Sequence, residues 1–174
     1  QTRDVALPTD SATSRKLCMW VLEQMGLNPR PVDMGPDLGQ MLKRCDGALL
    51  IGDRALDEAA RHPELVRMDL GQAWLEQTGH PMVYAVFAAH RDSPTDMLVE
   101  AHQLLVSQLE SFEQLEETRK SVVKSTSTRS GFSEERIEQY FHEVKLRLDE
   151  DGENGLRHFL QNVCGIESHQ MVEL

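Results

Sequence analysis

Residues 5–14 read VALPTDSATS, a short apolar run that ends in a proline and is followed by small hydroxyl and carboxyl side chains. The run Val5-Ala6-Leu7-Pro8 predicts a strand. The cluster from Asp10 to Ser14 consists of residues that cap helices, and apolar residues then recur at helical spacing until Gly26. This stretch therefore predicts a strand that leads directly into a capped helix, the opening unit of an α/β fold.

The same alternation continues through the first half of the chain. Residues 31–34 predict a second strand, and the continuous apolar run 47–52 predicts a strand that is buried on both faces. Residues 54–61 predict a helix, and residues 66–70 and 82–89 predict two further strands. Strands that alternate with short helices indicate βαβ units and a largely parallel sheet.

The second half of the chain has a helical pattern. A long helix is expected from Pro94 toward Val123, a polar loop over residues 125–131, and a helix from Ser133 with a capping box. Asp151-Gly152 predicts a break, and residues 155–163 predict the last helix.

Composition excludes several classes of function. A net charge of −11 argues against a nucleic-acid partner, and no apolar run is long enough to span a bilayer. The three cysteines, Cys18, Cys45 and Cys164, are widely spaced and predict reduced thiols in a cytoplasmic protein. The seven histidines show no metal-ligand spacing, so no metal site is predicted.

The candidate site begins at the helix start Ser11-Ala12-Thr13-Ser14. Exposed N–H groups and the positive end of the helix dipole could hold a carboxylate or a phosphate there. The alternative is a plain helix cap, which such clusters usually form. Position favours a site, because ligands in open α/β sheets bind beyond the carboxyl ends of the strands.

Two further segments are candidates. Gly52 at the end of a predicted strand would let a ligand approach closely, and Asp53 could orient a hydroxyl or act as a base. The equally favoured alternative is that Asp53 caps the next helix. Thr78-Gly79 could serve as a hinge between lobes.

These segments together resemble one family. The pattern is carried by residues 5–14, by Asp46 to Leu56, by Asp69-Leu70-Gly71-Gln72-Ala73-Trp74 and by residues 78–88, and more loosely by residues 155–160. It is similar to chorismate dehydratase of the futalosine route to menaquinone. The resemblance implies a two-lobed fold of the type II periplasmic-binding-protein kind and conversion of chorismate to 3-[(1-carboxyvinyl)oxy]benzoate without a cofactor. The substrate is a dicarboxylate, which suits an anion site at the helix start.

The resemblance also implies a division of the chain. Residues 1–80 would form the second lobe, and residues 81–174 a return strand and helices that complete the first lobe, of which an N-terminal part with the main catalytic residue is expected to be missing. Isolated, the segment is then expected to lack turnover. Ser11, Ala12, Thr13, Ser14, Gly52 and Asp53 would bind substrate, with Asp53 as the catalytic candidate. A sister enzyme that makes 1,4-dihydroxy-6-naphthoate and a non-catalytic carboxylate receptor are the alternatives, and the oligomeric state is left open.

Overall fold

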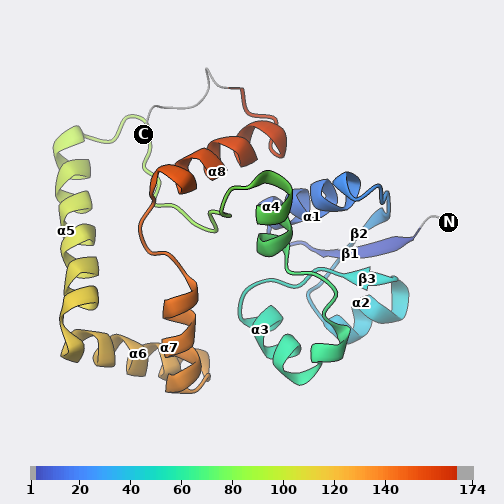
Figure 1. Cartoon of the computed structure of the whole chain (residues 1–174), viewed down its shortest axis with the longest axis horizontal. Coiled ribbons are helices and arrows are strands. Elements are labelled where there is room, and N and C mark those ends of the chain that lie inside the picture. Colours follow the sequence, from blue (N-terminus) through green and yellow to red (C-terminus); the bar gives the residue numbers. More distant parts are fainter. Residues whose placement is uncertain (1–2, 168–174) are drawn as a thin grey trace. The chain divides into compact units, whose positions relative to one another are not determined.

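The computed structural model describes residues 3–167, which divide into two compact units. The first unit runs to Val83 and resumes at Asp149, and the second spans Tyr84–Leu148. Figure 1 shows the elements of both.

A parallel sheet of three strands organises the first unit. The central strand β1 (Asp4–Pro8) pairs with β2 (Arg30–Met34) on one side and with the short β3 (Gly47–Ala48) on the other, in the order β2-β1-β3. Val5 lies opposite Pro31 in one pair and opposite Gly47 in the other. The α/β class and the parallel sheet predicted from the sequence are confirmed.

Helices cover both faces of this sheet because side chains alternate along β1. Val5 and Leu7 pack with Cys18 of α1 (Ala12–Gln24), whereas Ala6 packs with Met41 of α2 (Leu38–Arg44). The crossover from β1 to β2 and the crossover from β2 to β3 run across the sheet in opposite directions, so right-handed connections place α1 and α2 on opposite faces.

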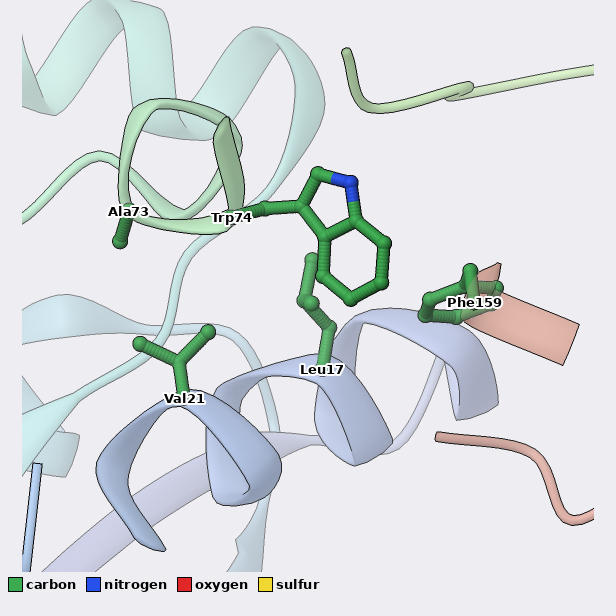
Figure 2. Close-up of a cluster of buried hydrophobic side chains, with 5 residues drawn as sticks. All are labelled: Leu17, Val21, Ala73, Trp74 and Phe159. Atoms are coloured by element: carbon green, nitrogen blue, oxygen red, sulfur yellow. The ribbon is translucent and has the colours of Figure 1, made fainter. Parts of the chain in front are cut away.

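A second layer of packing joins elements that are far apart in the sequence. Leu17 and Val21 of α1, Ala73 and Trp74 of α4 (Leu70–Thr78), and Phe159 of α8 (Glu150–Asn162) form one buried cluster. Figure 2 shows Trp74 reaching from α4 over Leu17, with Phe159 approaching from α8. Trp74 is completely buried, so this cluster holds the C-terminal helix to the sheet domain.

Two predicted strands are wrong. Residues 66–69 form no strand and follow the short helix η1 (Pro63–Leu65), and residues 82–89 form no strand either. Val86 and Phe87 are 55% and 86% exposed. A strand needs a neighbouring strand on its hydrogen-bond ladder, and no described strand pairs with this run.

The predicted break at Asp151-Gly152 and the predicted helix start at Gly155 are wrong, because α8 includes both glycines. Asp149 caps α8 by accepting a hydrogen bond from the Gly152 N–H at 2.9 Å, so the helix passes through the expected break. Inside it, Gly155 allows close packing: a Cβ there would lie 2.4 Å from the Pro81 carbonyl oxygen. Gly155 thus sets how α8 packs against the segment after α4.

The second unit is helical. It contains α5 (Thr95–Gln114), α6 (Glu116–Ser130) and α7 (Glu134–Glu143). The long predicted helix is interrupted at Leu115, and the predicted loop at 125–131 is wrong because α6 continues to Ser130. Ser133 caps α7 as expected, but the predicted capping box is wrong, because the third residue after the cap is Arg136, which has no side-chain acceptor to complete the box.

Arg119 connects the three helices of this unit. Its guanidinium lies 2.9 Å from Glu138 of α7 and 5.2 Å from the ring centroid of Phe112 in α5. Arg119 of α6 therefore joins all three helices by an ion pair and a cation–π contact.

Candidate functional site

The site begins where β1 passes into α1. Ser11 is the N-cap of that helix: its Oγ accepts a hydrogen bond from the Ser14 N–H at 3.3 Å and lies 2.8 Å from the Ser14 Oγ. The simple capping role considered from the sequence is therefore present. The cap involves the side chains of Ser11 and Ser14, and it does not involve Ala12 and Thr13, which lie between them.

Those two residues present donors to solvent. Ala12 and Thr13 are exposed, and in the described part of the chain neither of their N–H groups nor the Thr13 hydroxyl has a hydrogen-bond partner. Such N–H groups carry the positive end of the helix dipole. Two amide donors and one hydroxyl at a helix start form an arrangement that can bind a carboxylate.

The second candidate segment lies at the start of α3 (Gly52–Arg61). Gly52 has a φ of +59°, which favours glycine, and no atom lies within 4 Å of the position that a Cβ would occupy. Gly52 therefore leaves open space, as expected for a ligand approach.

Asp53 lies in the first turn of α3 and is exposed. The N-cap position belongs to Ile51, which makes no side-chain capping bond, so the interpretation of Asp53 as the cap is wrong. The carboxylate is placed well for the helix dipole, and it is free to face a ligand. Its role as an acid or base stays a prediction.

An ion pair brings the two segments together. Arg54 Nη1 of α3 lies 2.8 Å from Asp10 Oδ2, directly before the α1 cap. In the order β2-β1-β3, the crossover from β1 to β2 and the crossover from β2 to β3 run in opposite directions, so the carboxyl ends of β1 and β3 lie side by side at the topological switch point, where the strand order reverses. Open α/β sheets bind ligands at such points, and the residues Ser11 to Ser14 and Gly52-Asp53 lie there.

A cavity of about 240 Å³ opens beside this point, between the start of α2 and α3. Leu50, which follows β3, and Arg54 of α3 both line it. The remaining lining residues are Pro36, Asp37, Leu38, Gly39, Asp57 and Glu58.

The third candidate segment lies elsewhere in the unit. Thr78 ends α4 and Gly79 is its C-cap, with a φ of +75°. The following residues pack on α8: the rings of His80 and His158 lie 5.7 Å apart, and Pro81 lies against Gly155. No contact described for this segment joins it to Ser11 or Asp53, and its role as a hinge stays a prediction.

The Cys18 thiol is not suited to act as a nucleophile or a base at neutral pH. Burial between α1 and the sheet raises the pKa of the Cys18 thiol to about 11, so this group stays protonated at neutral pH. Within residues 3–167 we find no cluster of side chains suited to hold a metal ion and no helix that is long and apolar enough to cross a membrane.

Comparison with known proteins supplies the family. A family model described as menaquinone biosynthesis matches residues 1–163. The chain belongs to the menaquinone biosynthesis family. A chorismate dehydratase from Thermus thermophilus is 31% identical to it over 173 residues, which cover 90% of this chain and 61% of the relative. The family that the sequence motifs indicated is confirmed, and the chain spans about 61% of the length of that curated relative.

In this member of the menaquinone biosynthesis family, two features of the site were not predicted from the sequence. One is Arg54, whose partner Asp10 is 44 positions away in the chain. The other is the cavity beside α2. A basic residue directly after Gly52-Asp53 was the available signal for Arg54, but its partner depends on the pairing of β1 with β3.

Proposed function

We propose that the protein that contains this chain is a lyase that dehydrates chorismate to 3-[(1-carboxyvinyl)oxy]benzoate in menaquinone biosynthesis. In this elimination a ring C–H bond and the ring C–OH bond break, water leaves, and the diene ring becomes aromatic. No electrons are exchanged with a cofactor. The family and the name of the Thermus thermophilus relative support this reaction.

The observation that carries the proposal is the set of three hydrogen-bond donors at the start of α1 that have no partner among the described residues. The substrate has two carboxylates, and one of them would accept hydrogen bonds from the N–H groups of Ala12 and Thr13 and from the Thr13 hydroxyl. Ser11 and Ser14 would hold the helix start in shape for this contact. Binding at this point orients the ring for elimination.

Asp53 is the proposed acid–base candidate within this chain. It lies in the first turn of α3, next to Arg54, whose ion pair with Asp10 joins α3 to the start of α1, and beside the open space at Gly52. A carboxylate there would face the ring of a substrate whose carboxylate sits on α1. Gly52 would keep the space between them free.

We further infer that the protein has two lobes of the type II periplasmic-binding-protein kind, with residues 1–80 in one and the segment after residue 81 contributing to the other, except that α8 packs with α1 and α4 of the first. The exposed side chains of Val86 and Phe87 support this, because exposed apolar surface is typical of a contact with a further part of a protein. The longer relative supports it as well, since 39% of its length lies outside the match. Closure of two lobes would exclude water from the substrate. The cysteines, none of which forms a disulfide, support a cytoplasmic location.

The test is turnover by the longest natural form of the protein. We expect loss of the chorismate diene absorbance and appearance of one aromatic product. Thr13→Ala should raise KM severalfold with a smaller change in kcat, and Asp53→Asn should lower kcat more than it weakens binding. Formation of 1,4-dihydroxy-6-naphthoate from a different, larger precursor, with no loss of chorismate, would identify the sister activity.

Two results would overturn the proposal. Tight binding of chorismate without product would show a carboxylate receptor of the same fold. Neither binding nor product would remove chorismate as the ligand. Thr126→Ala in α6 of the second unit provides a matched control, because it removes the same hydroxyl far along the chain from the site.

A further inference from the structure

The ion pair between Asp10 and Arg54 stands out by its place next to the donors of α1. Asp10 directly precedes the cap Ser11, so its carboxylate belongs to a residue only two positions before Ala12 and three before Thr13, whose N–H groups are the donors. A helix start attracts carboxylates of the protein as readily as those of a ligand. An unpaired Asp10 would therefore oppose an incoming anion by repulsion and by competition for the donors.

Arg54, the partner of Asp10, occupies a position in its helix where a positive charge is unfavourable. Arg54 lies in the first turn of α3, where the helix dipole disfavours a cation. Among the residues that line the neighbouring cavity it is the one basic side chain, beside the carboxylates of Asp37, Asp57 and Glu58. Arg54 therefore brings positive charge to a strongly acidic region.

Stability alone gives little reason for this arrangement. The side chains of Arg54 and Asp10 are 54% and 43% exposed, and ion pairs between such exposed groups contribute little to folding. The ion pair matters more for ligand binding than for folding. It neutralises the Asp10 carboxylate, which would otherwise repel an anion that approaches the α1 donors.

We propose that Arg54 is a positioning and specificity residue for the anionic substrate of this site. Its guanidinium holds the Asp10 carboxylate away from the amide donors of α1 and cancels its charge, so that the donors accept a ligand carboxylate. The inference rests on the proposed function, since it concerns the affinity of the same site for a dicarboxylate.

The experiment measures kcat and KM for chorismate in the longest natural form of the protein and in three variants. Arg54→Gln leaves Asp10 unpaired and should raise KM about three- to fivefold, as expected for one added negative charge near the site. Adding Asp10→Asn in the same chain should return KM to within about twofold of the wild type. The rise in KM should shrink as salt increases, because salt screens exposed charges.

The matched control is Arg61→Gln. Arg61 pairs with Asp57 at 2.9 Å on the same helix, seven residues from Arg54 and so about 10 Å along the axis. It removes the same charge and a similar exposed ion pair, and KM should change less than twofold.

Each outcome decides between roles. If the pair only fastened the two loops, the double variant would be as impaired as Arg54→Gln, and the effect would not depend on salt. Either result overturns the inference, as does an unchanged KM for Arg54→Gln. Absence of turnover and binding in the wild type would instead remove the proposed function.

Discussion

Replacing Gly155 with alanine tests the contact that fastens α8 to the segment after α4. The added Cβ would lie 2.4 Å from the Pro81 carbonyl oxygen and 3.3 Å from the His80 Cβ. Because the nearer atom belongs to the backbone, α8 or the segment itself must move by roughly 1 Å to restore van der Waals contact.

The magnitude follows from two opposing effects. Overpacking of this kind costs about 1–3 kcal/mol. Alanine inside a helix gains up to about 1 kcal/mol over glycine. Gly39→Ala in α2 measures the gain with little of the cost, because its Cβ would meet only the Asp37 side chain at 3.4 Å. Gly155→Ala should therefore be less stable than Gly39→Ala by about 1–3 kcal/mol.

Urea unfolding followed by tryptophan fluorescence is the suitable assay. The chain contains two tryptophans, and Trp20 and Trp74 both belong to the cluster that includes Phe159 of α8. Their emission therefore reports on this packing directly. In a thermal scan the difference corresponds to a fall of about 2–4 °C for each kcal/mol. Equal stability of Gly155→Ala and Gly39→Ala would refute the close contact between α8 and Pro81.

Three further predictions concern the first unit. Trp74→Ala should lose about 3–5 kcal/mol of unfolding free energy in the same urea assay, because a fully buried side chain leaves a cavity between α1, α4 and α8; a loss below 1 kcal/mol would contradict that packing. Asp69→Ala should lose about 1 kcal/mol and Asp69→Ser should recover most of it, since the Asp69 carboxylate accepts the Gln72 N–H at 2.8 Å; equal losses would exclude the cap. Cys18 should resist alkylation at pH 8, and the pH dependence of stability should show its raised pKa: below pH 9 the thiol is protonated in both states, and as pH rises toward 11 only the unfolded thiol ionises, so stability falls. Cys18→Ala should remove that part of the fall, and rapid labelling of folded Cys18 would contradict its burial.

Local patterns predicted the elements that depend on neighbours in the sequence. The strand at residues 5–8, the cap at Ser11 and the cap at Ser133 are present because each needs only a few consecutive residues. The α6 helix shows where such patterns fail. Its polar run from Ser125 to Ser130 has little helical preference of its own, but the packing of Val123 and the ion pairing of Arg119 stabilise the same helix.

In α8 the error was the opposite one: a helix break was predicted at glycine residues that lie inside a helix. Gly152 and Gly155 weaken a helix in isolation, and from the sequence they suggested a break and a boundary. In the folded chain Gly152 donates its N–H to the Asp149 cap, and Gly155 admits the Pro81 carbonyl. The reason for a glycine at each position lies in a contact that sequence spacing does not show.

By itself the sequence determined the α/β class, the helix start at Ser11, the candidate residues Gly52 and Asp53, and the family. These follow from short-range capping, periodicity and motif order. Only the tertiary structure decided that β1 and β3 are neighbours, and hence that Asp10 meets Arg54 and the two halves of the site face one switch point. The physical reason is that strand order is set by crossovers and by the burial of both sheet faces, which involve residues more than 40 positions apart.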